Sequence, residues 1–404
     1  MRFKGVRVDV EKAHQLKQQL LEQEKGLLQE IKRETQIDAQ IWAARSIATV
    51  FDKLKLPYKR TEKTNAPSFT KNFLQEHEHP LVKKIAKARE INKAHTTFID
   101  TILRYEHKGR IHADINQIRS DQGGTVTGRF SYSNPNLQQI PARNKDLGPL
   151  IRSLFVPESG CEWGCFDYSQ QEPRLVVHFA ATTAGIKEDN SVKEIVDNYS
   201  NNDIDFHKTV ADMAGISRIQ AKTINLGLFY GMGKAKLQAE LGLSTKQEAE
   251  TLFNQYHDRV PFVRDLMNET SRWASREGEI RTLLGRGCRF NKWEPAQFGM
   301  HTPMTWEDAV KKYGENRIRR AFTYKALNKL IQGSAADMTK KSMLDLYKEG
   351  IIAHIQIHDE LDLSVESPEQ AKKVVEIMEN AVKLDVPNKV DYESGKNWGD
   401  IYDK

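Results

Sequence analysis

Residues 355–363 read IQIHDELDL, and their apolar and polar side chains alternate. A period of two is typical of a half-buried β-strand, so the pattern predicts one face lined by Ile355, Ile357, Leu361 and Leu363. Asp359 stands at the centre of that row, and Glu360 follows it directly. A turn at these two carboxylates would give a hairpin with an acidic tip. Carboxylates near apolar residues are costly unless a cation lies against them. The tip is therefore either solvated or part of a metal site, and this stretch alone does not decide.

A second acid favours the metal site. Residues 162–180 read EWGCFDYSQQEPRLVVHFA, in which a short apolar strand runs into Asp167 and an apolar run resumes at Leu175. Asp167 is therefore expected at the end of a strand and at the mouth of a loop. Mg²⁺ takes oxygen ligands and is often held by one or two carboxylates together with substrate phosphates. Asp167 and Asp359 on neighbouring strands would hold a metal pair about 3.5–4 Å apart, as in nucleotidyl transfer.

Five stretches, in order along the chain, resemble the motifs of the family A (DNA polymerase I-like) DNA polymerases, and bacteriophage-type members most. They are TGRFSYSNPNLQQIPAR from Thr127, DYSQQEPR from Asp167, RIQAKTINLGLFYGMG from Arg218, LNKLIQGSAADM from Leu327 and IHDEL from Ile357. The resemblance implies an α+β right-hand polymerase fold with an antiparallel palm sheet, helical fingers and a helical thumb. It also implies template-directed DNA synthesis, in which dNTPs extend the primer of a primer-template DNA.

The resemblance assigns the catalytic groups residue by residue. Asp167 and Asp359 would hold two Mg²⁺ ions, the backbone carbonyl of Tyr168 would complete one site, and Glu360 would belong to the same group. One ion would lower the pKa of the primer 3′-hydroxyl, and the other would accompany the triphosphate and the pyrophosphate. Lys222 would donate a proton or a positive charge to the leaving group.

The nucleotide site is predicted on a helix. Arg218, Lys222, Leu226 and Tyr230 are spaced by four, so each step drifts only about 40° around a helix. From geometry alone, this is either a solvated basic stripe or a surface for a triphosphate followed by a base. The resemblance implies the second, with Arg218 and Lys222 on the triphosphate and Tyr230 at the nascent base pair. His207 matches a phosphate-contacting histidine of the family.

Sugar selection is predicted at Glu172, which would crowd a ribose 2′-hydroxyl, with Gln170 as a further nucleotide-binding residue. Three departures from the family pattern bear on this site. Leu226 stands where Phe or Tyr is more common, and Tyr324 stands where bacterial members often have arginine. Gln171 and Pro173 replace apolar residues, and the missing backbone donor of proline puts the local backbone in question.

DNA contacts are also carried over from the family. Arg129 is expected in the minor groove at the primer terminus, where hydrogen-bond acceptors recur in every base pair. Gln332 is expected in the minor groove on the template side, at the start of a helix. Further DNA-binding candidates are Asn328, His358 and Arg143.

Composition is consistent with this interpretation but does not establish it. The 404 residues carry a formal net charge of +6, which suits a nucleic-acid partner weakly. The cysteines, Cys161, Cys165 and Cys288, give no disulfide framework. No apolar run approaches the roughly 20 residues of a transmembrane helix, and the N-terminus is too charged for a signal peptide. We therefore expect a soluble protein without a membrane partner, in a reducing compartment such as the cytoplasm, or the host cytoplasm for a phage protein.

Along the chain, apolar periodicity predicts helices over residues 11–34 and 80–107. Polar composition predicts a loop over 56–72 and a long loop or insertion over 291–316. The expected divisions are thumb and N-terminal helices 1–118, first palm segment 119–204, fingers 205–325 and second palm segment 326–404. The end should be a helix over 367–383 followed by a polar tail. Asp9 and Glu11 resemble the opening of an exonuclease motif, but too few residues precede the polymerase motifs for such a domain. A processivity factor is not identified by the sequence.

Two alternatives to DNA synthesis are open. A single-subunit RNA polymerase or a reverse transcriptase would share the two aspartates, although Glu172 and the QGSAAD stretch favour DNA synthesis. A non-catalytic DNA-binding remnant should have lost its metal carboxylates, and this chain retains them.

Overall fold

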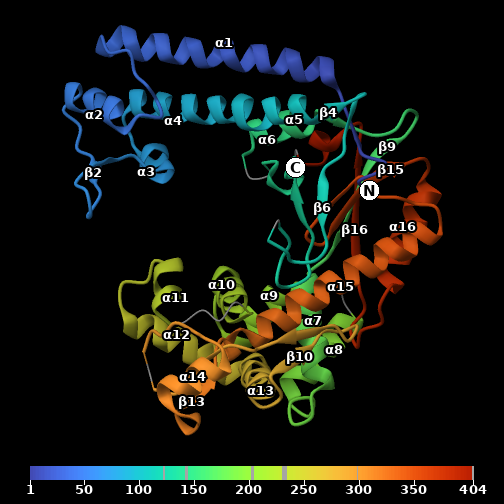
Figure 1. Ribbon diagram of the computed structural model, residues 1–404. Helices are drawn as coiled ribbons and strands as arrows, with labels where there is room; N and C mark the ends of the chain where they lie inside the picture. The colour runs from blue at the N-terminus through green and yellow to red at the C-terminus, as the bar shows by residue number, and fades with distance from the viewer. Residues whose placement is uncertain (122, 142–143, 202–203, 230–233, 298, 403–404) are drawn as a thin grey trace.

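The computed structural model covers the chain and describes all residues except 122, 142–143, 202–203, 230–233, 298 and 403–404. For Leu226, Leu228, Phe229 and Tyr402 it describes the backbone alone. Figure 1 shows two long helices along one side, a group of shorter helices on the other side, and a sheet between them. The predicted α+β class with an antiparallel central sheet is confirmed. No helix among the described residues is both long and apolar enough to cross a membrane.

The N-terminal helices form a unit with its own apolar core. Helices α1 (Val10–Thr35) and α4 (Pro80–Lys93) run side by side in opposite directions, as Figure 1 shows. A π-helical segment, Ala94–Ile99, and α5 (Asp100–Tyr105) continue α4, so both predicted helices are confirmed. Asp9, set aside above as an exonuclease residue, caps α1 by accepting from the Lys12 N–H at 2.9 Å. The predicted loop contains only the short pair β2 (Lys59–Arg60) and β3 (Pro67–Ser68), flanked by α2 (Ala44–Lys53) and α3 (Lys71–Glu76).

Small strands connect this unit to the central sheet. Strand β1 (Val6–Val8) pairs with β5 (Arg110–Ile111) on one side and with β8 (Phe155–Val156) on the other. Strand β4 (Glu106–His107) completes this sheet, and β6 (Asp114–Asn116) pairs with β7 (Ser131–Ser133) beside it. A 3₁₀ turn, Leu137–Gln139, and α6 (Leu147–Arg152) follow. The predicted division at residue 118 stays a prediction, as do those at 204 and 325.

The central sheet has the strand order β14-β15-β9-β16, with every neighbouring pair antiparallel. Its strands are β9 (Glu162–Tyr168), β14 (Ile355–Ile357), β15 (Glu360–Val365) and β16 (Val390–Gly395). Since side chains alternate across a strand, the register puts Leu361, Leu363 and Phe166 on one face. Trp163 and Cys165 point to the other.

The predicted single apolar face of residues 355–363 is wrong. The chain reverses at His358 and Asp359, and Ile355 lies opposite Asp362 while Ile357 lies opposite Glu360. Ile355 therefore packs into the core that holds Trp163 and Cys165, whereas Leu361 packs into the opposite core. The alternation was real, but a two-residue turn transfers the apolar row from one face of the sheet to the other.

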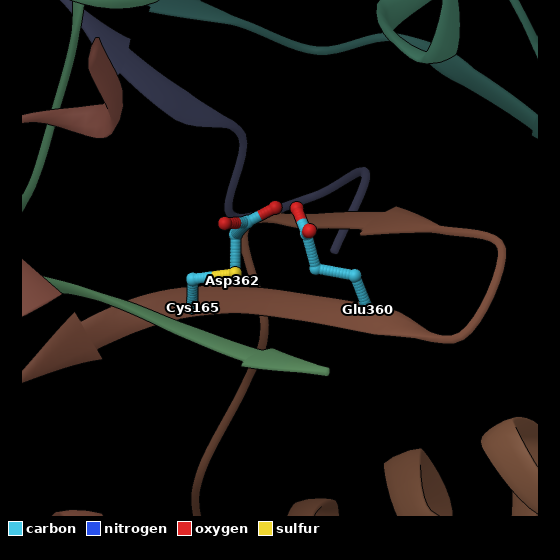
Figure 2. A group of neighbouring side chains, drawn as sticks. All are labelled: Cys165, Glu360 and Asp362. Carbon is cyan, nitrogen blue, oxygen red and sulfur yellow. The ribbon is translucent and has the colours of Figure 1, made fainter. Parts of the chain in front are cut away.

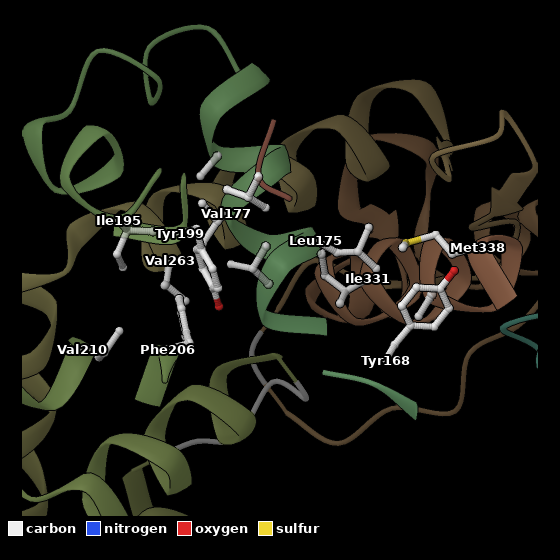
Figure 3. Close-up of a cluster of buried hydrophobic side chains, with 14 of the residues drawn as sticks. Tyr168, Leu175, Val177, Ile195, Tyr199, Phe206, Val210, Val263, Ile331 and Met338 are labelled. Carbon is white, nitrogen blue, oxygen red and sulfur yellow. The ribbon is translucent and has the colours of Figure 1, made fainter. Parts of the chain in front are cut away.

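Helices cover the Leu361 face of the sheet. They are α7 (Gln171–Thr182), α15 (Ala326–Lys348) and α16 (Pro368–Asn380). In Figure 3, Leu175 and Val177 of α7 lie between Ile331 and Tyr168 on one side and Ile195 and Phe206 on the other. The shared core thus joins the central sheet to the second helical group.

That second group is mainly helical; its first helix precedes residues 205–325, the segment predicted as helical fingers, and the others fall within it. Its helices are α8 (Asn190–Asn201), α9 (Phe206–Ala214), α10 (Arg218–Phe229), α11 (Lys234–Glu240), α12 (Lys246–Arg259) and α13 (Pro261–Glu277). Strands β10 (Glu279–Arg281) and β11 (Gly287–Arg289) form a hairpin after them. Of the two alternatives predicted for 291–316, the long loop is wrong, because β12 (Trp293–Pro295) pairs with β13 (Ile318–Arg320) and α14 (Trp306–Tyr313) lies between them in sequence. The other alternative, an insertion, stays a prediction.

The predicted polar tail is wrong as well. After α16 the chain returns as β16, which pairs with β9 from Tyr168 to Trp163. Trp398 then lies fully buried, with its ring centroid 5.8 Å from that of Trp163 and 5.3 Å from that of Phe155. The guanidinium of Arg152 lies 4.2 Å from the Trp398 ring centroid. The last residues therefore close the Trp163 face of the sheet.

Replacing Trp398 with alanine should lower the free energy of unfolding by about 3–5 kcal/mol, because it opens a large cavity in this core. Urea denaturation followed by circular dichroism measures the change. Trp306→Ala is the control, since that ring is 42% exposed. The control should shift stability by no more than about 0.5 kcal/mol. Equal effects of the two substitutions would contradict the role assigned to Trp398.

Candidate active site

The turn between β14 and β15 presents Asp359 at one end of the sheet. His358 adopts φ +56°, a left-handed conformation that few residues other than glycine accept. Three polar contacts hold the turn in place. Gln356 Nε2 donates to the His358 carbonyl at 2.5 Å, Tyr132 Oη accepts from the Gln356 N–H at 3.2 Å, and Gln138 Nε2 donates to the Gln356 carbonyl at 3.3 Å. Residues of the TGRFSYSNPNLQQ stretch thus support the acidic tip.

Asp167 lies beside that tip, within a row of acids. Glu360 is its direct partner across β9 and β15, and Asp391 is its partner across β9 and β16. Burial raises the pKa of Asp167 to about 8, and the charges of Asp359, Glu360 and Asp391 contribute further. Burial also raises the pKa of Asp359 to about 6. Acids from neighbouring strands therefore repel one another at a single end of the sheet.

This donor set fits hard divalent cations. The ligand atoms that Asp167 and Asp359 offer are carboxylate oxygens, which Mg²⁺ prefers. The Tyr168 N–H donates to the Asp359 carbonyl at 3.3 Å and so joins the two predicted ligand segments. The Tyr168 hydroxyl is buried against Ser342 and the Met378 carbonyl, so any part this residue has in the site belongs to its backbone.

Behind Asp167, a second acidic group lies on the same face of the sheet. Figure 2 shows Cys165, Glu360 and Asp362 together. Burial raises the pKa of Asp362 well above its usual range, and the Glu360 charge raises it further. Asp362 lies two residues after the triplet His358-Asp359-Glu360. Its burial could not be predicted from the sequence, because an acid in an alternating strand is usually exposed to solvent.

Glu172 lies in the first turn of α7, where its carboxylate meets Arg129. Arg129 Nη2 is 2.5 Å from Glu172 Oε1, and both side chains are largely buried. The structure therefore joins the predicted sugar-selecting residue to the predicted minor-groove residue. Pro173 causes no break, because the N–H groups of a first helical turn have no partner within the helix.

The predicted triphosphate residues lie near the junction of α9 and α10. Arg218 forms an ion pair with Asp205, the residue that caps α9, at 2.5 Å, while Lys222 is exposed one turn further on. His207 is buried, and Asn225 Nδ2 donates to its Nδ1 at 3.1 Å. Burial lowers the pKa of His207 to about 4, with Lys222 and Arg218 lowering it further after a partial offset by Asp205. His207 is thus a neutral imidazole beside two cations.

Gln170 has a structural use that the sequence did not suggest. It begins α7 with φ +53°, its Nε2 donates to the Ile204 carbonyl at 2.8 Å, and its Oε1 accepts from the Phe206 N–H at 2.7 Å. These bonds fix the start of α9 against the start of α7. Its predicted contact with nucleotide stays a prediction.

Helix α15 places Asn328 and Gln332 on successive turns, both half-buried. The prediction that Gln332 begins a helix is wrong, because α15 starts earlier, at Ala326. The Asn328 Nδ2 atom is buried without a hydrogen-bond partner among the described residues. Tyr230 and Arg143 lie outside the described residues, as does the side chain of Leu226, and their assignments stay predictions.

Sequence reasoning missed Arg286. Its Nε contacts Asp337 at 3.0 Å, and its Nη2 donates to the carbonyls of Thr127 and Gly333 at 2.7 and 2.9 Å. A Cβ at Gly128 would lie 2.7 Å from the Arg286 Cζ atom, which explains why the TGR stretch needs glycine there. Arg286 thus joins α15 to the loop that carries Arg129.

Comparisons with known proteins find relatives along nearly the whole chain. The family model for DNA polymerase family A matches residues 10–400. The chain is similar to a DNA-directed DNA polymerase of Pseudomonas phage M6, at 32% identity over 99% of this chain and 64% of the relative. It is also similar to the thermostable DNA polymerase I of Thermus filiformis, at 34% identity over 98% of this chain and 46% of the relative.

A solved structure is similar along nearly the whole chain. It is the POL domain of Pol1 from M. smegmatis in complex with DNA primer-template and dNTP, with a TM-score of 0.75 and 27% identity. The alignment covers 98% of this chain and 68% of that chain. The chain spans about half to two thirds of the length of the two curated relatives named above.

Without divalent metal, the protein should lose stability progressively as pH rises to about 8, because the folded state raises the pKa of Asp167 to about 8. An aspartate in an unfolded chain titrates near about 3.9. The contribution of the neutral acid is therefore fully present below that value and is lost as pH rises through the folded pKa. Asp359 adds a loss in the same direction that is complete by about pH 6.

Melting temperatures measured in EDTA from about pH 5 to about pH 9 test this expectation. Asp167→Asn should flatten the profile, and Mg²⁺ should reduce the loss of stability with rising pH by neutralising the acids. A profile that Asp167→Asn leaves unchanged would show that other groups cause the loss.

Proposed function

Because the chain belongs to DNA polymerase family A, we propose that this protein catalyses template-directed DNA synthesis, adding deoxynucleotides to a primer 3′ end. The observation that carries the proposal is the meeting of Asp167 and Asp359 at one end of a rigid sheet. Acids that repel one another in this way are a common sign of a metal-dependent site. The predicted site of action, the cytoplasm of a cell or host cell, stays a prediction.

The metal ligands in this proposal are Asp167, Asp359 and the backbone carbonyl of Tyr168. Two Mg²⁺ ions bound there would activate the primer 3′-hydroxyl and neutralise the charge that develops on the triphosphate. The protein's own contribution is to fix the two carboxylates. The β9–β15 register holds Asp167, and the contacts of Gln356, Tyr132 and Gln138 hold the turn that carries Asp359.

Lys222, Arg218 and His207 bind the incoming triphosphate in this proposal. Lys222 is exposed and places a compact charge near the leaving group. Arg218 has Asp205 as its partner, so phosphate competes with that carboxylate for the guanidinium. His207 stays neutral because of its burial, so it serves as a hydrogen-bonding group rather than a third cation. Tyr230 stacking on the nascent base pair rests on sequence alone.

Primer-template DNA is held by contacts that do not read sequence. Arg129 and Gln332 are assigned to minor-groove acceptors, with Asn328 and His358 as neighbours on the DNA side. The unpartnered Asn328 Nδ2 atom supports this assignment, since a buried donor without a partner is costly until a ligand supplies one. Arg143 is proposed from the sequence only.

Sugar selection in this proposal depends on Glu172 and on the arginine that holds it. A family member with tyrosine in place of Leu226 has a hydroxyl that can bond the glutamate, and leucine offers none. The ion pair between Arg129 and Glu172 supplies the missing restraint. A carboxylate held at this point would leave no room for a 2′-hydroxyl.

Asp167→Asn or Asp359→Asn should abolish primer extension, since each change removes a negative charge that organises metal. DNA binding should largely survive, because phosphate contacts elsewhere supply most of the affinity. Extension of a labelled primer with Mg²⁺ and dNTPs, together with a DNA-binding titration, measures both. Glu393→Gln is the matched control, because this exposed carboxylate lies on β16 of the same sheet. Extension above a few per cent of wild type in either aspartate variant would refute the assignment.

Glu172→Ala should raise ribonucleotide incorporation relative to dNTP incorporation by a factor on the order of ten to a hundred. Arg129→Ala should also raise relative ribonucleotide incorporation, because it releases the Glu172 side chain. The double variant should therefore show less than the product of the two single effects. Single-nucleotide insertion kinetics with dNTP and rNTP give the ratios and also separate DNA synthesis from RNA synthesis.

The control for this pair is Arg110→Ala. It breaks a comparable ion pair to Glu158, at 2.7 Å, in the small sheet. That variant should leave the sugar ratio unchanged. If Arg129→Ala also leaves the ratio unchanged while Glu172→Ala raises it, contacts other than the one with Arg129 hold the Glu172 side chain.

A further inference from the structure

Cys165, Glu360 and Asp362 form a compact cluster behind the row of acids at the sheet end. Asp362 lies directly opposite Cys165 across β9 and β15, and Glu360 lies two residues before Asp362 on the same face. One ligand atom from each residue can be chosen so that all of them lie within 4.8 Å of one another. Figure 2 shows the two carboxylates facing each other above the cysteine side chain.

Asp362 has an unused ligand atom in this cluster. Its side chain is 0% exposed, and Trp163 Nε1 donates to Oδ1 at 2.9 Å. The other oxygen, Oδ2, is buried and receives no donor from the rest of the described residues, and the side chain meets the Glu360 carboxyl group. Its neighbour Glu360 is itself an acid. Two carboxylates that face each other in a buried place need a proton or a cation between them.

We propose that Cys165, Glu360 and Asp362 bind a transition-metal dication of borderline softness, with Zn²⁺ as its representative. The cysteine sulfur sets this class, because thiolate suits zinc and similar ions and does not suit Mg²⁺. Burial and the neighbouring acids raise the pKa of Cys165, so its thiol loses the proton as the ion binds. Zinc lies about 2.3 Å from sulfur and about 2.0–2.2 Å from carboxylate oxygen. The ligand atoms therefore need only a small inward movement, and the flexible Glu360 side chain supplies it. Three protein ligands leave a fourth position for water.

The site is built on rigid elements and has a route of entry. Cys165 and Asp362 are fixed by strand pairing and by the Trp163 side chain, whereas Glu360 is half-buried beside the turn. An ion would enter on the Glu360 side. Glu360 is also the cross-strand partner of Asp167, so an ion here would hold its carboxylate away from the Asp167 row. That consequence, inhibition of synthesis by zinc, rests on the proposed function, whereas the site itself does not.

Co²⁺ is the probe that tests the site, because thiolate bonded to Co²⁺ gives a sulfur-to-cobalt charge-transfer band in the near ultraviolet. The full chain is titrated with Co²⁺ in excess Mg²⁺, which occupies hard oxygen sites. We expect the band to appear, to be displaced by Zn²⁺, and to vanish in Cys165→Ser. Cys288→Ser is the matched control, because Cys288 is a buried thiol in a different core cluster and should leave the band intact.

Asp362→Asn gives a second, independent variant that keeps the side-chain volume. It should weaken Co²⁺ binding at least tenfold, and circular dichroism checks that each variant is folded. Absence of a sulfur band in the folded wild-type chain would overturn the proposal and indicate that a shared proton bridges the carboxylates. A band that survives Cys165→Ser would also overturn it. If the wild-type chain shows the band but does not extend a primer, the result would count against the proposed function alone.

Discussion

The antiparallel register of β15 against β9 is the constraint on which the rest of the structure depends. It sets Glu360 opposite Asp167 and Asp362 opposite Cys165, and so collects acids on one face of one sheet. The other face of the same strands is apolar and packs against α7, α15 and α16. A slip of one residue would exchange the faces, burying Glu360 in the apolar core and placing Leu361 among the acids. The apolar face therefore enforces the position of the acids, and the fold and the site are fixed by the same pairing.

The turn that carries Asp359 needs support from outside the sheet. His358 occupies a left-handed conformation that costs roughly 1–3 kcal/mol. Tyr132 and Gln138 come from a stretch more than two hundred residues away, and they bond the backbone next to this turn. Arg286 fixes the beginning of that stretch to α15. The Thr127–Arg143 motif thus supports the turn at His358 and Asp359 structurally, in addition to any contact with DNA.

The sequence predicted what local pattern and motif content determine, and it failed where partners come from far along the chain. The helices over 11–34 and 80–107 followed from apolar periodicity, and the acids at the sheet end followed from two short motifs. The turn at His358 divided a real alternation between two cores, which a period of two cannot reveal. Strand β16 was taken for a tail because its residues 391–394 are polar and exposed, as suits an edge strand. Asp362 and Arg286 were missed because burial and partners decide their roles, and neither leaves a local signal.

The acids at the sheet end make the metal-free fold less stable than it could be. Burial of Asp167, Asp359 and Asp362 opposes their ionisation, and each neighbouring carboxylate adds to that opposition. A sheet that served packing alone would gain stability from apolar residues at these positions. The surrounding core compensates, since Trp163 and Trp398 stack behind the acids and β16 closes the edge beside them. Because cations recover the electrostatic cost only when they bind, the same carboxylates that weaken the empty fold would give it affinity for metal at the proposed sites. The same residues therefore lower the stability of the metal-free fold and would favour metal binding. The packing of Trp163 and Trp398 compensates for the lost stability.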